Sequence, residues 1–301
     1  MRDCFKQPII ESMTYKYFLL TLALTLLAAC DRAAPPAPDL AADALRIANE
    51  SILVDTHIDV PYRLSEAPAD VSQATDSGDF DYPRARAGGL DAAFMSIYTP
   101  AGLEAEGRSR EDADQLIDLV EKLVADSDGK FAIATSPGDV RENFEKEVMS
   151  LPMGMENGSP LEGDLANLRH FHERGIRYIT LAHSQSNHLS DSSYDENRQW
   201  NGLSEFGTEV VREMNNLGIM VDVSHLSDDA FWQVLELSTA PVIASHSSAR
   251  HFTPDWERNM SDEMITALAE NGGSLMINFG SACITDEARA NSTERWPAAP
   301  A

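Results

Sequence analysis

The sequence predicts an α/β protein built on a parallel β-sheet, and three observations lead to this fold class. From residue 41 onward, short runs of apolar and β-branched residues alternate with longer stretches of helical periodicity. The short runs are almost continuously apolar, as strands buried on both faces are. No glycine-rich phosphate-binding loop follows any of them. Doubly wound and (β/α)₈ arrangements are both compatible with this pattern.

The expected elements follow in chain order. The predicted strands are Ile52–Asp55, Ala92–Tyr98, Phe131–Thr135, Val148–Met155, Arg177–Leu181, Ile219–Val223, Pro241–Ser245 and Ser274–Asn278. Residues 109–125, 161–174, 206–217, 228–237 and 261–271 carry apolar side chains three or four positions apart, so we expect helices there. Ser136, Ser227 and Ser261 stand where N-caps belong, and Gly175 and Gly218 stand just past helix ends.

The N-terminal segment has the pattern of an export signal. Residues 17–29 are uncharged and follow Lys16, but they are fewer than the roughly twenty that a bilayer-spanning helix needs. The segment ends in small residues directly before Cys30, and Leu27–Cys30 resembles the lipobox of bacterial lipoproteins, in which the cysteine thiol is acylated. Met13 is an alternative start to Met1, since it brings Lys16 near the front.

The expected organisation therefore has three parts. Residues 1–29 form a lipoprotein signal peptide, residues 30–40 a Pro/Ala tether, and residues 41–301 the folded domain. We expect a lipid-anchored protein of the bacterial cell envelope that faces the periplasm.

The charge of the chain excludes one class of partner. The 301 residues include 49 acidic and 23 basic side chains, a formal net charge of −26. Such a chain repels phosphate backbones, so we expect no nucleic-acid partner. Anionic membrane surfaces repel it too, which leaves the lipid on Cys30 as the expected membrane contact. With 3 cysteines in total, a disulfide framework is also excluded.

Metal-ligating residue types collect where the predicted strands end. Because the carboxyl ends of parallel strands meet at one end of a barrel, these side chains are expected close together. Imidazole and carboxylate groups are suitable ligands for a divalent metal, and a glutamate followed by the flexible pair Asn157-Gly158 could bridge two cations. His183 also follows a strand and is a candidate substrate contact. The predicted metal ligands are His57, Asp59, Glu156, His225 and His246.

Ordered motifs make the prediction more specific. The matching stretches are VDTHIDVPYRL, GMENGSPLEGDLANLRHFHERGIRYITLAHSQSN, GLSEFGTEVVREMNNLGIMVDVSHLS, APVIASHSSAR and ERNMSDEMI. In this order, over about residues 50 to 280, the sequence resembles the membrane (renal) dipeptidase family of zinc peptidases. The resemblance implies a (β/α)₈ TIM-barrel metallohydrolase that hydrolyses dipeptides through a water activated by two zinc ions.

The resemblance also implies a role for each site residue. His57 and Asp59 would bind the first zinc, His225 and His246 the second, and Glu156 would bridge both. His183 matches the residue that polarises the scissile carbonyl and stabilises the oxyanion, and Arg258 matches the residue that holds the C-terminal carboxylate of the substrate. Two cations that share a water lower its pKa, and a guanidinium binds a carboxylate with two parallel hydrogen bonds. The expected partners are a dipeptide and the membrane, with a homodimer left open.

The strand count is one short of the eight that define this barrel. With residues 131–135 set aside as an accessory strand, the last barrel strand is Ser274–Asn278. The family continues with an eighth strand that ends in a Gly-Ser-Asp-Phe-Asp-Gly-like motif, which this sequence lacks. We therefore expect a C-terminally truncated barrel without the last strand and helix, with unpaired strand edges.

Two other functions are weighed against the dipeptidase. A truncated barrel is also compatible with a catalytically impaired or non-catalytic lipoprotein that binds metal or peptide. Another amidohydrolase on the same barrel is less compatible, because such enzymes usually begin with His-x-His, whereas here the first strand ends His57-Ile58-Asp59.

Overall fold

A computed structural model describes residues 39–292, and its strands form one parallel sheet. The chain divides into two compact units, residues 1–44 and 45–301, and the sheet lies in the second. Every strand pairing is parallel, and the strand order is β3-β4-β2-β5-β6-β7-β8-β9, with β1 also paired to β2. The predicted fold class is thus confirmed. Cys30 and the segment predicted as a signal peptide lie outside the described residues.

The elements have the following bounds. The strands are β1 Leu53–Ile58, β2 Leu90–Tyr98, β3 Phe131–Ile133, β4 Met149–Leu151, β5 Met153–Glu156, β6 Ile176–Thr180, β7 Met220–Asp222, β8 Ile243–Ser247 and β9 Ser274–Ile277. The α-helices are α2 Leu40–Glu50, α3 Val60–Glu66, α4 Tyr82–Ala87, α5 Gly102–Glu106, α6 Ser109–Asp126, α7 Pro137–Glu145, α8 Leu165–Glu173, α9 Glu205–Leu217, α10 Asp228–Leu237, α11 Asp262–Glu270, α12 Ser281–Ile284 and α13 Asp286–Ser292. Two short 3₁₀ turns, η1 Ser159–Leu161 and η2 Arg250–Phe252, complete the described set. Within residues 39–292, no helix is both long and apolar enough to cross a bilayer.

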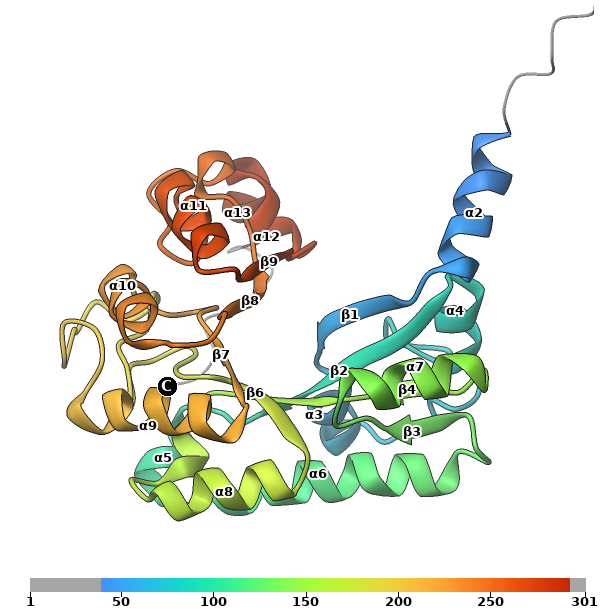
Figure 1. The fold of residues 1–301 in the computed structure, drawn as a ribbon, viewed down its shortest axis with the longest axis horizontal. Helices are drawn as coiled ribbons and strands as arrows, with labels where there is room; N and C mark the ends of the chain where they lie inside the picture. The colour runs from blue at the N-terminus through green and yellow to red at the C-terminus, as the bar shows by residue number, and fades with distance from the viewer. Residues whose placement is uncertain (1–38, 293–301) are drawn as a thin grey trace, which may run out of the picture. The chain divides into compact units, whose positions relative to one another are not determined.

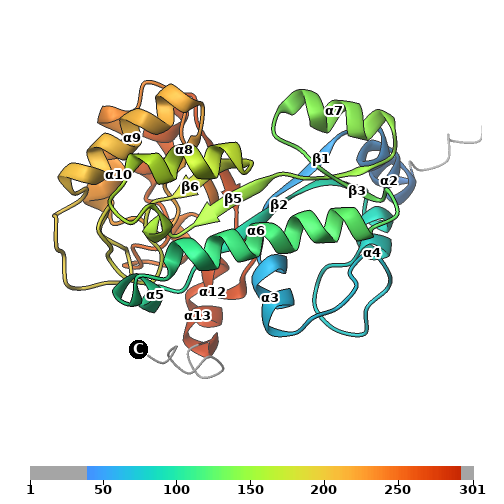
Figure 2. The same ribbon diagram turned by 90° about the horizontal axis from the view of Figure 1, so that it is seen from below.

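The predicted N-cap serines and Gly218 lie at helix ends. The side chains of Ser136, Ser227 and Ser261 accept hydrogen bonds from backbone amides in the first turns of α7, α10 and α11. Such caps satisfy amides that have no partner within the helix. Gly218 ends α9 with φ +77°, a conformation that glycine adopts without steric cost. Helices α6 and α8 pack against β2 and β6 (Figure 2), and α9 and α11 pack against β7 and β9.

The predicted strand over residues 148–155 is two strands, because Pro152 interrupts it. Pro152 has no amide hydrogen to donate to the sheet, although its carbonyl accepts from the amide of Met95. Before the proline, β4 pairs with β2 and β3; after it, β5 pairs with β2 and β6. The accessory strand predicted at residues 131–135 is β3, which pairs with β4 alone. The break therefore separates an accessory pair of strands from those that run to the site.

The sheet curls so that β1 returns towards β8 (Figure 1). The hydroxyl of Thr56 in β1 donates to the carbonyl of Ser245 in β8 at 2.7 Å. In the part of the chain that the structure describes, no strand joins β1 to β9, as the strand count predicts. Apolar side chains are exposed at these edges, among them Val54 and Ile277, which are 46% and 48% exposed.

Candidate metal centre

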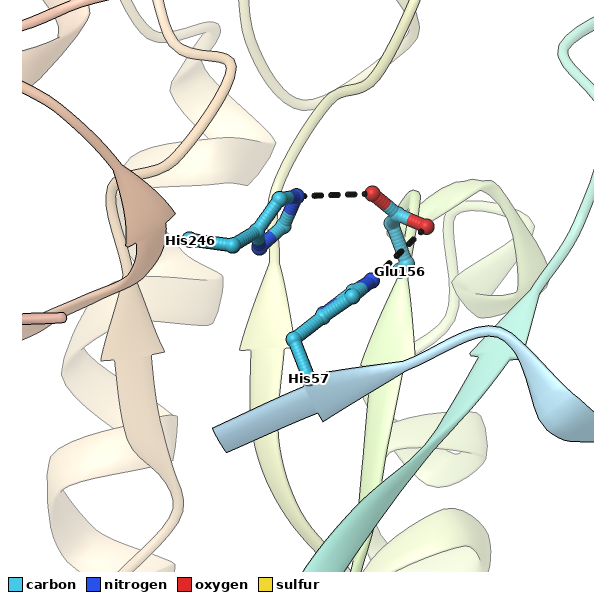
Figure 3. A group of neighbouring side chains, drawn as sticks. All are labelled: His57, Glu156 and His246. Atoms are coloured by element: carbon cyan, nitrogen blue, oxygen red, sulfur yellow. Dashed lines mark hydrogen bonds and ion pairs between the residues drawn. The ribbon is translucent and has the colours of Figure 1, made fainter. Parts of the chain in front are cut away.

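The carboxyl ends of the strands bring histidines to one buried glutamate (Figure 3). Glu156 is the last residue of β5 and is 4% exposed. Its Oε2 lies 3.3 Å from Nε2 of His57, which belongs to β1. Its Oε1 lies 3.1 Å from Nε2 of His225, just after β7, and 3.1 Å from Nε2 of His246 in β8. The two oxygens thus face separate histidines, as a bridging carboxylate requires.

These side chains form two groups of metal-ligand type that share Glu156. His57, Glu156 and His246 form one, and Glu156, His183 and His225 form the other, with all ligand atoms of a group within 4.8 Å of one another. Nε2 of His225 is also 2.8 Å from Nε2 of His246. Unprotonated imidazole nitrogens and a carboxylate oxygen repel one another at such distances, so a cation between them would stabilise the arrangement. The donor set therefore fits divalent cations such as zinc.

Asp59 lies at the solvent-facing side of the cluster. It precedes α3, its side chain is 63% exposed, and its Oδ1 lies 3.4 Å from Nε2 of His57. It is in neither group of ligand atoms that converge within 4.8 Å. Its role as a ligand of the first zinc stays a prediction.

The pKa of each group in the cluster depends on the charges of its neighbours. Burial alone would raise the pKa of Glu156, but His57 and His183 hold it well below its usual range. Burial would lower the pKa of His57, but Glu156 and Asp59 raise it to about 10. Burial, followed by the charge on His57, lowers the pKa of His246 to about 4. Without a cation, the cluster therefore keeps a proton on His57, while the ring of His246 is neutral.

The backbone at His225 is strained. This residue has φ +68°, in the left-handed region that costs side chains with a Cβ about 1–3 kcal/mol. Burial and the nearby Arg258 together hold the pKa of His225 well below its usual range. The neutral ring keeps a lone pair on Nε2, which accepts a hydrogen bond from Nη2 of Arg258 at 3.1 Å.

His183 and Arg258 lie beside this cluster, as the sequence predicts for substrate contacts. Nε2 of His183 is 3.5 Å from Oε1 of Glu156. Arg258 is 4% exposed and donates to the hydroxyl of Ser247 at 2.9 Å and to the carbonyl of His246 at 2.7 Å. Within residues 39–292, no carboxylate lies at ion-pair distance from Arg258. A buried guanidinium without a counter-charge is suited to bind an anion.

The turn after Glu156 is fixed by buried hydrogen bonds, so the expectation of a flexible Asn157-Gly158 is wrong. Asn157 is 1% exposed, donates to the carbonyl of Thr99 and accepts from the side chain of Asn187. A Cβ at Gly158 would lie 2.4 Å from Leu189. The carboxylate of Glu156 is therefore held by a rigid support.

Sequence reasoning missed two buried residues that contact the histidines and a third that contacts one of these two. The hydroxyl of Tyr178 is 2.8 Å from Nδ1 of His57, and the hydroxyl of Ser245 is 2.7 Å from Nδ1 of His246. Asp222 in turn accepts from Ser245 at 2.6 Å. Asp222 could have been recognised from the sequence, because a charged residue inside an apolar strand needs buried partners. Tyr178 could not have been recognised in this way, because an aromatic residue is ordinary in a strand.

The comparison with family models decides the family. The model described as Membrane dipeptidase (Peptidase family M19) matches residues 41–295. The chain belongs to the membrane dipeptidase family. Among curated relatives, it is 35% identical over 251 residues to dipeptidase 3 of Mus musculus, covering 80% of this chain and 50% of that one. An uncharacterized dipeptidase of Schizosaccharomyces pombe is 32% identical over 248 residues, covering 77% and 60%. The chain thus spans about half the length of these membrane dipeptidase relatives.

Solved structures agree with this assignment. A metallo peptidase from Rhodobacter sphaeroides, liganded with a phosphinate mimic of the dipeptide L-Ala-D-Ala, has a TM-score of 0.72 and 26% identity, covering 79% of this chain and 76% of that one. The probable dipeptidase PvdM from Pseudomonas aeruginosa has a TM-score of 0.74 and 28% identity, covering 83% and 65%. The parallel fold described above is thus that of membrane dipeptidase structures.

Proposed function

We propose that this protein is a metal-dependent dipeptidase that holds two zinc ions and hydrolyses the peptide bond of dipeptides. The observation that carries the proposal is the buried carboxylate of Glu156, whose two oxygens face different histidines at 3.1 to 3.3 Å. His57, Asp59, His225 and His246 would complete the ligand sets on the two sides of Glu156. Zinc bound here would lower the pKa of a water molecule and so provide a nucleophile at neutral pH.

His183 and Arg258, which lie beside the cluster, would stabilise the developing charge on the substrate carbonyl and bind the substrate. Burial lowers the pKa of His183, so its ring is neutral and Nε2–H can donate to the substrate carbonyl oxygen as negative charge develops. Arg258 would bind the free carboxylate of the substrate.

The spacing of these groups favours dipeptides. Nη2 of Arg258 lies 3.1 Å from Nε2 of His225, so the anion site adjoins the metal cluster directly. A substrate carboxylate bound there comes within one residue of the scissile bond. The Rhodobacter sphaeroides relative with its bound mimic of L-Ala-D-Ala supports this substrate class and supports acceptance of a D-residue at the C-terminal side.

The proposed location is the periplasmic side of a bacterial membrane, with a lipid on Cys30. Its support is the sequence pattern of residues 16–30. Incorporation of a labelled fatty acid into the wild-type chain but not into C30S tests it, and equal labelling of both contradicts it.

The enzymatic proposal is tested on the purified chain. Zinc content is measured by plasma mass spectrometry, and hydrolysis of a Gly-D-amino-acid dipeptide is followed by amine release, with E156Q as the matched control. We expect two zinc ions and turnover in the wild type and neither in E156Q. Two bound zinc ions without hydrolysis would contradict the dipeptidase and support the metal- and peptide-binding lipoprotein instead. The unpaired edges of β1 and β9 in the described chain are the observation that keeps this second function under test.

A further inference from the structure

Asp222, at the end of β7, is a fully buried carboxylate that touches no metal-ligand atom. Its Oδ1 accepts from the backbone amides of Ser224 at 3.1 Å and Ser245 at 2.9 Å. Its Oδ2 accepts from the hydroxyls of Thr180 at 2.5 Å and Ser245 at 2.6 Å. An ionised carboxylate is only an acceptor, so both hydroxyls must direct their hydrogens at Asp222.

This arrangement determines the hydrogen bond between Ser245 and His246. The hydrogen of the Ser245 hydroxyl is used on Asp222, so Oγ has only lone pairs to offer to Nδ1 of His246, 2.7 Å away. The proton of the neutral imidazole must then sit on Nδ1. Nε2 is left with a lone pair, and it is Nε2 that lies 3.1 Å from Glu156.

We propose that Asp222 is a positioning residue that acts through Ser245 to hold His246 in the one tautomer able to bind a cation. The inference deepens the proposed function and rests on the metal site described there. Partners outside the ligand shell commonly orient metal-binding histidines, and their loss typically costs about 10–100-fold in metal affinity.

The other histidines of the cluster supply a comparison. The hydroxyl of Tyr178 donates to the carbonyl of Thr56 at 3.1 Å, so it accepts from Nδ1 of His57, and Nε2 of that ring faces Glu156. Among the described residues, Nδ1 of His225 and Nδ1 of His183 are buried without a hydrogen-bond partner. A hydrogen bond therefore holds a hydrogen on Nδ1 of His57 and of His246 but not on Nδ1 of the other two rings, so a fixed Nδ1 hydrogen is not a general property of the buried histidines.

The substitution Asp222→Asn reverses the hydrogen bonds. The Asn oxygen keeps the two backbone amides, and its NH₂ group then faces the hydroxyls of Thr180 and Ser245. The Ser245 hydroxyl then accepts a hydrogen bond from the NH₂ group that D222N introduces, and it donates its own hydrogen to Nδ1 of His246. The imidazole proton is displaced to Nε2, where it blocks metal binding. Ser245→Ala removes the partner of Nδ1 without reversing any bond, so either tautomer can form.

The test uses the full chain purified in detergent. Zinc affinity is measured by competition with a chromophoric chelator, and ¹⁵N spectra of labelled histidine in the metal-free protein at pH 8 report which ring nitrogen of His246 carries the proton. We expect D222N to lose about 10–100-fold in affinity for one zinc ion and to carry the His246 proton on Nε2. We expect S245A to lose less. The control T180V removes a donor to Asp222 but leaves Ser245 in place, so its affinity should stay within about threefold of wild type.

The two readouts separate the inference from the proposed function. A proton on Nδ1 of His246 in D222N overturns the inference, even if zinc affinity falls, because Asp222 would then act only through packing. Wild-type affinity in D222N overturns it as well. Absence of zinc from the wild type contradicts the proposed metal site, while the proton position in wild type and D222N still decides the role of Asp222. Circular dichroism confirms that each variant is folded.

Discussion

Glycine at position 154 is required because the ring of Tyr178 occupies the place of a side chain. A Cβ added at Gly154 would lie 2.0 Å from Cζ of Tyr178 and 2.3 and 2.4 Å from the two flanking ring carbons. Non-bonded carbons approach to roughly 3.5–4.0 Å, so Gly154→Ala creates overlaps of about 1.1–1.5 Å or more with three atoms. Tyr178 is fully buried and its hydroxyl contacts His57 and Thr56, so the ring cannot move without losing both hydrogen bonds.

The expected cost follows from these contacts. Overpacking a core costs about 1–3 kcal/mol, and each lost hydrogen bond adds about 1 kcal/mol. We therefore expect G154A to lower the free energy of unfolding by about 3–5 kcal/mol. Urea denaturation in the presence of a chelator measures this, with G102A as the matched control, since a Cβ at Gly102 meets nothing within 4 Å. G102A should stay within about 1 kcal/mol of wild type.

A double variant identifies the cause. In G154A/Y178L the ring is gone, so the double variant should be more stable than the sum of its single variants predicts, by at least about 2 kcal/mol. If G154A unfolds within about 1 kcal/mol of wild type, or if the two substitutions are additive, the close approach of ring and backbone is refuted.

Further outcomes are expected at the cluster. Glu156→Gln should remove both zinc ions rather than one, because each oxygen of Glu156 faces a different histidine; retention of one zinc in elemental analysis would contradict the bridging arrangement. Arg258→Ala should raise KM for dipeptides by about 10- to 150-fold and leave kcat less affected, because a charged hydrogen bond contributes about 1.5–3 kcal/mol; a dipeptide amide, which lacks the carboxylate, should not respond. The pKa of His57 is about 10 in the metal-free fold against 6.5 for the free group, so its contribution to stability is complete below pH 6.5 and is lost as the pH rises to 10. The urea concentration at the midpoint of unfolding of the metal-free protein should fall as the pH rises through this range, and it should fall less in H57N. An equal fall in both proteins would contradict the raised pKa of His57.

The sequence predicts the sheet well because a strand that is buried on both faces is apolar, and this composition can be recognised in the local sequence. The runs at residues 92–98 and 177–181 are apolar since both faces of β2 and β6 are covered, and this composition is visible without any tertiary information. The histidines are predictable for a related reason: parallel strands end at the same side, so His225 and His246 must lie near each other.

Other features depend on contacts between distant segments. The break at Pro152 was readable from the proline itself, but its effect depends on β2 pairing with both β4 and β5. The hydrogen bonds of Asp222 with Ser245 and of Tyr178 with His57 and Thr56 join residues that are 23 to 122 positions apart. Nothing in the local sequence specifies such distances, because they follow from the register of the assembled strands.

The metal-ligand cluster also brings together two strands, β1 and β8, that are not paired by backbone hydrogen bonds. Thr56 in β1 and Ser245 in β8 are 189 positions apart, and among the described strands β1 pairs with β2 alone. A cation held between these strands would bind the folded chain and not the unfolded one, so it would stabilise the fold by its binding free energy. Metal uptake and completion of folding are therefore expected to be one coupled event, with the metal bound only after the last of the contributing strands has reached the sheet.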